Sequence, residues 1–332
     1  MFFKNDFDFV AIGDTTIDAF IRVKEASVNC DINKENCQIC FDFANKVPYE
    51  SVTIVPAVGN SANAAVAAAR LGLKSAYVGN VGADQNGKDC INAFKSENVC
   101  AKFIKIHKDK KTNYHYVLWF KDERTILIKH EEFAYEMPHI GSPKWIYLSS
   151  LGENSLPFHQ EIENYLKFHP ETNLAFQPGT FQIKFGKGKL AGLYRMTKVF
   201  ICNLQEAQRI LGTKEDKPLE LMRMMSWLGP KILVITDGTK GAYAYNGNDA
   251  WFMPPYPDPK PPFERTGAGD AFSSTFVAGL AMGKTIEESL MMAPINSMSV
   301  VQKIGAQAGL LTLPEIEKYL EQAPEDYRPR KV

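Results

Sequence analysis

Short apolar segments alternate with helical patterns over most of the chain, and the alternation predicts an α/β fold. Apolar runs of about four to eight residues are typical of strands buried on both faces, and strands separated by helices favour a parallel sheet. The predicted strands span residues 7–12, 75–81, 145–148, 174–176, 199–202 and 232–236. The predicted helices span residues 61–71, 84–98, 157–168, 203–211 and 219–228, and a further helix runs from about 267 to about 282. We therefore expect a central, mostly parallel sheet covered by helices on both faces.

Two segments depart from this pattern. Residues 19–57 and 101–131 contain alternating apolar and polar positions, such as Phe103-Ile104-Lys105-Ile106 and Thr125-Ile126-Leu127-Ile128, and no helix intervenes in the second segment. Alternation of this kind indicates antiparallel strands with one solvated face. We expect these two segments to form a small β-sheet lid, separate from a large α/β domain made of residues 1–18, 58–100 and 132–332.

Composition and charge narrow the class of protein. The chain has 332 residues, of which 45% are apolar and 23% charged, and these values exclude disordered and fibrous classes. Lys and Arg together number 38, as do Asp and Glu, so no net charge attracts nucleic acid or an anionic membrane surface. No apolar run approaches the roughly 18 residues of a membrane helix, and the start of the chain has no signal-peptide pattern. We expect a cytoplasmic protein whose partner is a small molecule.

The cysteine pattern is ambiguous. Six cysteines are too few and too unevenly spaced for a disulfide scaffold in a chain of this size. Cys30, Cys37 and Cys40 could bind zinc, but their spacing is loose and no fourth ligand is identified. A set of reduced cysteines is the favoured interpretation.

The most informative segment is Glu264-Arg265-Thr266-Gly267-Ala268-Gly269-Asp270. Gly267 and Gly269 allow backbone N–H groups to converge, and the start of the following helix adds partial positive charge, which together favour anion binding. A carboxylate beside such a site would repel a resting phosphate, so Asp270 is suited to take a proton from a hydroxyl that attacks phosphorus. The alternative is a glycine-rich helix start with a capping aspartate. A dinucleotide fingerprint is excluded because the third glycine is missing, and Gly283-Lys284-Thr285 ends a helix where a P-loop would begin one.

Four motifs in order resemble those of the ribokinase-like (PfkB) sugar kinase family. They are Val58-Gly59-Asn60-Ser61-Ala62-Asn63 with Gly79-Asn80-Val81-Gly82-Ala83-Asp84, then Asn203-Leu204-Gln205-Glu206, Ile235-Thr236-Asp237-Gly238-Thr239-Lys240-Gly241, and Thr266-Gly267-Ala268-Gly269-Asp270-Ala271-Phe272. One motif alone would be weak, but the ordered set extends over nearly the whole chain. The resemblance implies a ribokinase-like fold with a β lid, and ATP and Mg²⁺ as cofactors. The predicted lid would expose a sheet edge and an apolar face that a partner subunit could cover, so we expect a homodimer through the lid.

The resemblance also implies roles for individual residues. Asp270 would be the general base, and the N–H groups of Gly267, Ala268 and Gly269 would hold the transferring phosphoryl group. The acceptor-binding residues would be Asp18, Gly59, Asn60 and Asn63. The nucleotide-binding residues would be Asn203, Thr236, Gly238, Gly241 and Thr266, and Glu206 would order the hydration shell of Mg²⁺.

The sequence departs from the family pattern in several places. Val58 replaces the first of two hinge glycines, and Glu264-Arg265 replaces an Asp-Thr pair whose aspartate helps to bind a monovalent cation. Arg265 could occupy the place of that cation, reach a phosphate, or pair with Glu264 as an ordinary loop residue. We expect activity that is independent of potassium. Pro294 stands where many members contact the nucleotide through asparagine, with Asn296 two residues later.

These observations favour an ATP-dependent kinase that phosphorylates a primary hydroxyl of a small ribose- or fructose-like sugar. A nucleoside acceptor is an alternative, since Tyr114, Tyr116, Trp119 and Phe120 in the predicted lid could stack on a base. A phosphorylated sugar is favoured only by Arg265. A protein that binds sugar or nucleotide without turnover is a further alternative, although such a protein has no need of Asp270 as a base.

Overall fold

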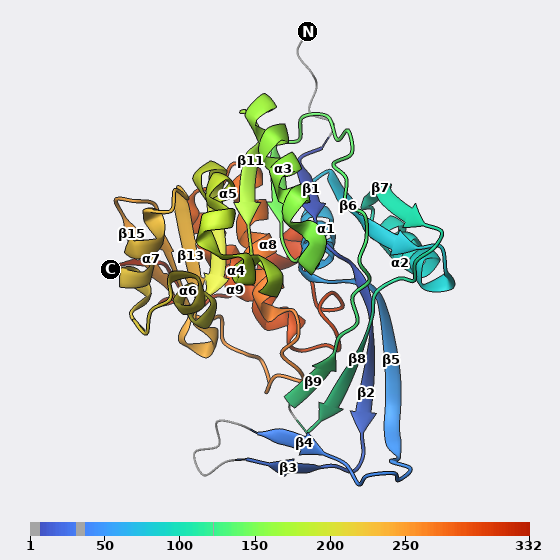
Figure 1. Cartoon of the computed structure of the whole chain (residues 1–332). Coiled ribbons are helices and arrows are strands. Elements are labelled where there is room, and N and C mark those ends of the chain that lie inside the picture. Colours follow the sequence, from blue (N-terminus) through green and yellow to red (C-terminus); the bar gives the residue numbers. More distant parts are fainter. Residues whose placement is uncertain (1–6, 31–36, 122) are drawn as a thin grey trace.

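The large sheet is built mainly from parallel strands, as the apolar runs predict. The structure, a computed structural model, describes residues 7–30, 37–121 and 123–332. Within these residues, ten strands form one sheet (Figure 1), and seven of them are parallel neighbours. In spatial order these seven are β7 (Cys100–His107), β6 (Ser75–Gly82), β1 (Phe9–Ile12), β10 (Trp145–Leu148), β11 (Asn173–Phe176), β12 (Thr197–Asn203) and β13 (Ile232–Thr236). Three antiparallel strands complete the sheet, namely β14 (Ala242–Tyr245), β15 (Ala250–Met253) and β16 (Arg330–Lys331).

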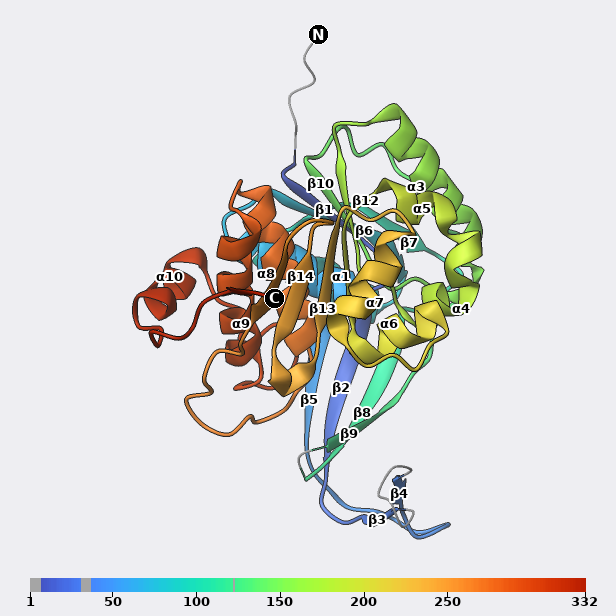
Figure 2. The ribbon, with the colours of Figure 1, turned by 90° about the vertical axis from the view of Figure 1, so that its left-hand side faces the viewer.

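Helices cover both faces of this sheet (Figure 2), and each face has its own apolar core. One face carries α1 (Asn60–Arg70), α2 (Gln85–Ser96), α8 (Ala268–Ala281), α9 (Ile286–Val300) and α10 (Leu313–Glu321). The other carries α3 (Leu156–Phe168), α4 (Thr180–Lys189), α5 (Ala191–Met196), α6 (Leu204–Leu211) and α7 (Pro218–Ser226), and two short 3₁₀ turns lie at Glu153–Ser155 and Gly238–Lys240. In β1, Phe9 and Ala11 face the first core whereas Val10 and Ile12 face the second. Because every side chain of such a strand is buried, its sequence is continuously apolar.

A second sheet projects from the large one (Figure 1) and is called the lid sheet below. It contains β5 (Tyr49–Val58), β2 (Thr16–Val23), β8 (Tyr114–Phe120) and β9 (Glu123–Leu127), in that order. The lid sheet is not wholly antiparallel, because β2 and β8 run in parallel. A short hairpin of β3 (Ser27–Asn29) and β4 (Gln38–Cys40) extends beyond its far end.

Two predictions for these segments are wrong. The stretch Phe103–Ile106 belongs to β7, which pairs in parallel with β6 at the edge of the large sheet rather than with the lid strands. Phe103 and Ile104 pack against opposite cores of the large sheet while Ile106 is 54% exposed, so the alternation does not mark one solvated face. Cys30 and Cys37 form a disulfide and are not reduced, which removes two of the three thiols proposed for zinc. No cluster of three or more potential metal-ligating His, Cys, Asp or Glu residues occurs in the described part of the chain.

The division of the chain into a large domain and a lid at the boundaries given above stays a prediction. Among the described residues, no helix is long and apolar enough to cross a bilayer. The carboxyl ends of β1, β10, β12 and β13 meet at the edge of the large sheet from which the lid sheet projects. In open α/β sheets ligands bind at this edge.

Candidate active site

The segment that begins α8 has the geometry expected of an anion site. Gly267 adopts a left-handed conformation with φ of 81°, and a Cβ there would lie 2.4 Å from the Cβ of Ala306, so only glycine fits. Within the described residues, the N–H groups of Gly267, Ala268 and Gly269 have no hydrogen-bond partner. The space beside Gly269 is open. These free N–H groups at a helix N-terminus can bind a phosphate oxygen.

Asp270 is held in place by three amide side chains. Asn60 and Gln177 donate to its Oδ1 at 2.9 and 3.2 Å, and Asn63 donates to its Oδ2 at 2.8 Å. These donors come from separate parts of the chain, since Asn60 and Asn63 lie in the first turn of α1 and Gln177 follows β11.

The amides themselves are oriented by further hydrogen bonds. The Asn60 carbonyl oxygen accepts from Ser150 at 3.0 Å, and that of Asn63 accepts from Gln307 at 2.9 Å. Burial raises the pKa of Asp270, and the hydrogen bonds from Asn63, Gln177 and Asn60 oppose this rise. The result is a fixed carboxylate with a raised proton affinity, as a general base requires.

A small cavity of about 220 Å³ lies beside Asn60 and under the lid sheet. Gly59 and Asn60 line it as predicted for acceptor residues, whereas Asn63 acts through its bond to Asp270. Asp18 is buried and does not line the cavity; instead its Oδ1 lies 3.3 Å from Nδ1 of His115, which does line it. Gly59 has φ of 120°, and a Cβ there would approach the Asp14 carbonyl oxygen to 2.7 Å.

A second cavity, of about 660 Å³, lies on the other side of the α8 N-terminus. It is lined by Asn203, Thr236, Gly238 and Gly241, which are four of the five predicted nucleotide residues. Thr266, the fifth, does not line it and donates both its N–H and its hydroxyl to Glu264. Ala268 and Gly269 line the cavity, so the anion site opens into it.

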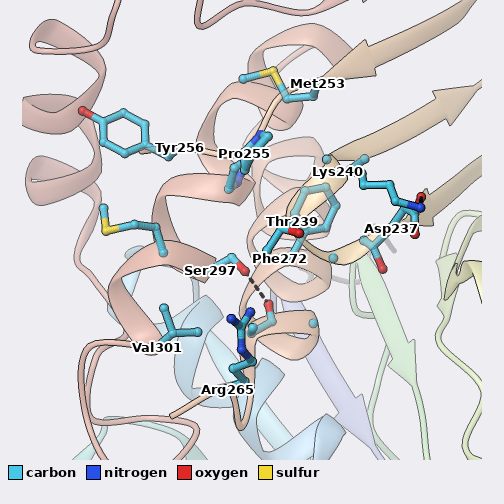
Figure 3. Close-up of a pocket in the computed structure, with 18 of the residues that line it drawn as sticks. Asp237, Thr239, Lys240, Met253, Pro255, Tyr256, Arg265, Phe272, Ser297 and Val301 are labelled. Atoms are coloured by element: carbon cyan, nitrogen blue, oxygen red, sulfur yellow. Dashed lines mark hydrogen bonds and ion pairs between the residues drawn. The ribbon is translucent and has the colours of Figure 1, made fainter. Parts of the chain in front are cut away.

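Figure 3 shows this cavity between Met253, Pro255 and Tyr256 on one side and Asp237 and Lys240 on another. The proline-rich segment therefore forms a wall of the cavity and is more than a connector. Arg265 also lines it, below Ser297 in the view. Pro294 reaches it as well, but Asn296 is fully buried and bonds to Thr275 and Leu311 instead.

Glu206 lies where a hydrated Mg²⁺ could be ordered. It forms a reciprocal capping pair with Asn203 at the start of α6, in which one carboxylate oxygen accepts the Asn203 N–H at 2.9 Å. Burial raises the pKa of Glu206, and the negative charge of Asp270 raises it further. Nearby positive charge would relieve this cost, and a carboxylate with an amide is a hard oxygen set of the kind Mg²⁺ prefers. The residues present fit the metal.

Comparison with known proteins identifies the family. The model of the pfkB family of carbohydrate kinases matches residues 10–313. The chain belongs to the pfkB family.

Similar proteins support this assignment. A sugar kinase of Archaeoglobus fulgidus, described as uncharacterized, is 26% identical over 251 residues, which are 73% of this chain and 96% of that protein. A nucleoside kinase of Methanocaldococcus jannaschii superposes with a TM-score of 0.76 at 17% identity, over 96% of this chain and 100% of that one. The ribokinase of Arabidopsis thaliana in complex with ribose and ATP superposes with a TM-score of 0.75 at 18% identity, over 94% of this chain and 98% of that one. The predicted family and ribokinase-like fold are confirmed.

Sequence reasoning about this pfkB-family kinase missed Asp14 and Tyr135. Asp14 lines the smaller cavity, and the Tyr135 hydroxyl lies 2.8 and 3.0 Å from its two oxygens. Burial raises the pKa of Asp14 to about 7. Asp14 lies two residues after the end of the first strand, which is the one signal that could have identified it, whereas Tyr135 lies in a loop without a motif.

The same cavity contains other unpredicted side chains. His130, Phe181 and Lys184 line it together with His115. The stacking residues suggested for a nucleoside, Tyr114, Tyr116, Trp119 and Phe120, are not among its lining residues. The strands of the lid sheet line this cavity of the pfkB site through Thr16 and His115, not through their large aromatic residues.

Proposed function

We propose that this pfkB-family kinase transfers the γ-phosphoryl group of ATP to a primary hydroxyl of a small sugar. The observation that carries the proposal is the position of Asp270. Its carboxylate is held at the start of α8, between a cavity sized for a single sugar ring and a larger cavity lined by the predicted nucleotide residues.

The reaction follows from this arrangement. A sugar hydroxyl in the smaller cavity donates its proton to the Asp270 carboxylate while its oxygen attacks the γ-phosphorus. The N–H groups of Gly267, Ala268 and Gly269 stabilise the negative charge on the transferring group, and ADP leaves with the broken bond's electrons. Asn203 and Glu206 would hold hydrated Mg²⁺, which would supply positive charge to neutralise the phosphates. The lid sheet excludes water, so that ATP is not hydrolysed.

The identity of the acceptor is argued from the smaller cavity. A volume of about 220 Å³ with polar groups from Asn60, Asn113 and His115 suits a monosaccharide. A nucleoside is the second candidate, because the rings of His130 and Phe181 meet edge-on at 6.3 Å beside the cavity. The argument from Arg265 to a phosphorylated acceptor loses its support, since Arg265 lines the nucleotide cavity.

The test is a coupled assay of ADP release over a panel of pentoses, hexoses and nucleosides. We expect acceptor-dependent ADP release that requires Mg²⁺ and is lost in Asp270→Asn. Release with nucleosides alone would favour the second candidate. ATP binding without release of ADP for any acceptor would indicate a binding protein instead.

We also propose a homodimer through the lid sheet. Ile54, Tyr116 and Leu127 lie in one cross-strand row on the face that points away from the site, and each is 47–58% exposed. An apolar face of this kind is costly in water and is commonly covered by a partner. The cytoplasmic location expected from the sequence stays a prediction.

A further inference from the structure

Glu264 is a buried carboxylate at the base of the anion site. It is 5% exposed, and its Oε2 accepts from the N–H and the hydroxyl of Thr266. Its Oε1 accepts from the N–H of Gly305 at 3.1 Å. Thr266 directly precedes Gly267, so the Glu264 carboxylate fixes the backbone that presents the free N–H groups.

The cation that faces this carboxylate comes from the lid sheet. Nη1 of Arg124, on β9, lies 3.6 Å from Oε2 of Glu264. The side chain of Arg124 is 30% exposed, and this ion pair is its one charged contact among the described residues. The sequence pointed to Arg265 as the partner, but Arg265 is exposed and lines the nucleotide cavity. The charge of Arg124 also acts on Asp270 and favours its ionised form.

Two apolar contacts join the same parts of the molecule. The Trp119 ring of β8 meets Phe263, the residue before Glu264, with ring centroids 5.0 Å apart. Gly305 lies against Phe20 and Val55 of the lid sheet, which a Cβ on Gly305 would approach to 3.7 and 3.4 Å. Phe263, which precedes Glu264 in the chain, and Gly305, whose N–H donates to the Glu264 carboxylate, therefore both lie against lid strands.

We propose that Arg124 is a positioning residue that couples the lid sheet to the anion site through Glu264. A buried carboxylate without a countercharge is poorly stabilised. With Arg124 beside it, the Glu264 carboxylate is held against Thr266 and Gly305 by charge-assisted hydrogen bonds, which are stronger than neutral ones. The N–H groups of Gly267, Ala268 and Gly269 are then fixed for phosphoryl transfer only while the lid sheet covers the acceptor. This role rests on the proposed kinase function.

The experiment is a double-mutant cycle with Arg124→Gln and Glu264→Gln in the full chain. Because a displaced anion site misplaces the reacting groups, we expect Arg124→Gln to lower kcat by about 10²-fold with KM for ATP changed little. The double variant should be no worse than the poorer single variant, and Arg124→Lys should recover part of kcat. The matched control is Arg223→Gln, which breaks the surface ion pair with Glu220 on α7 and should leave kcat unchanged. Unchanged kcat in Arg124→Gln, or losses that multiply in the double variant, would overturn the proposal.

A readout that does not depend on turnover separates this proposal from the proposed function. Amide hydrogen exchange should accelerate by about tenfold at Thr266 and Gly305, whose N–H groups donate to the Glu264 carboxylate, in Arg124→Gln and not in Arg223→Gln. If the unchanged protein shows no kinase activity but this exchange pattern appears, the kinase proposal fails and the coupling stands. If the protein is active and exchange in Arg124→Gln equals that of the unchanged protein, the coupling is wrong and the kinase proposal stands. Melting temperatures of all variants identify any that fail to fold.

Discussion

Asp270→Asn tests the core of the proposed mechanism because it changes the chemistry at one position with little change in shape. An asparagine side chain can accept hydrogen bonds at its oxygen only, and that oxygen would face Asn60 and Gln177. Its NH₂ group would then face the Nδ2 of Asn63, which lies 2.8 Å from Oδ2 of Asp270 in the unchanged protein. Asn63 cannot turn its oxygen towards residue 270 without losing its bond from Gln307. One buried donor is left without an acceptor, which costs about 1–3 kcal/mol.

The effect on catalysis should be larger. Loss of a general base lowers turnover by about 10²–10⁴-fold, which corresponds to about 2.7–5.4 kcal/mol in the activation barrier. The lost stability is offset in part because the neutral amide removes the cost of burying a charge. We therefore expect a fold that survives, ATP and acceptor affinities within a few-fold, and a much lower kcat.

The assay is ADP release under saturating ATP and acceptor, with ATP affinity measured separately by thermal shift. The pH dependence provides a second criterion. Asp270 is active when ionised and burial raises its pKa, so kcat/KM of the unchanged protein should fall with decreasing pH at a higher pH than an ordinary aspartate would give. Asp270→Asn should lose this acid limb. A variant that keeps near-full kcat, or the same acid limb, would refute the assignment of Asp270 as the base.

Four further predictions concern the acceptor side, the cation site, stability and assembly. Asp18→Ala should raise KM for the acceptor strongly and KM for ATP little, since Asp18 contacts the cavity residue His115. Equal changes of the two KM values in steady-state kinetics would contradict this. Initial rates should not rise when potassium replaces sodium at constant ionic strength, because Arg124 already lies 3.6 Å from Glu264. A second cation about 4 Å from the Arg124 charge would be repelled by about 4 kcal/mol at a dielectric constant of 20; a several-fold rise in rate would contradict this. The pKa of Asp14 is raised to about 7, so the stability that the protonated carboxyl contributes is complete below about pH 4 and is lost as pH rises towards 7. Asp14→Asn should therefore reduce the difference in Tm between pH 5 and pH 8. An unchanged difference would argue against this role of Asp14. Light scattering should give the mass of a dimer, whereas a monomer at high concentration would reject the lid interface.

The sequence by itself determined the layers of the fold and the order of its motifs. Strands such as Ile232–Thr236 can be predicted from continuous apolar runs, because a strand covered on both faces has few polar positions to interrupt the run. The anion site at Gly267-Ala268-Gly269-Asp270 could be predicted from the sequence because it depends on local backbone geometry, which neighbouring residues set.

Pairings between distant segments required the tertiary structure. The sequence of Phe103–Ile106 alternates in the same way as that of a lid strand, so this segment could not be assigned to its sheet from its pattern. The disulfide of Cys30 with Cys37 depends on a hairpin whose register the spacing does not specify. The amide groups that hold Asp270 are up to 210 positions away in the chain.

Glu264 illustrates the same limit at the site. Its adjacent residue in the sequence is a cation, Arg265, yet the cation nearest its carboxylate is Arg124, 140 residues earlier in the chain. Local sequence sets backbone conformation and burial pattern, because both depend on residues a few positions apart. Which side chain neutralises a buried charge depends on how two sheets pack, and that is decided only when the whole chain has folded.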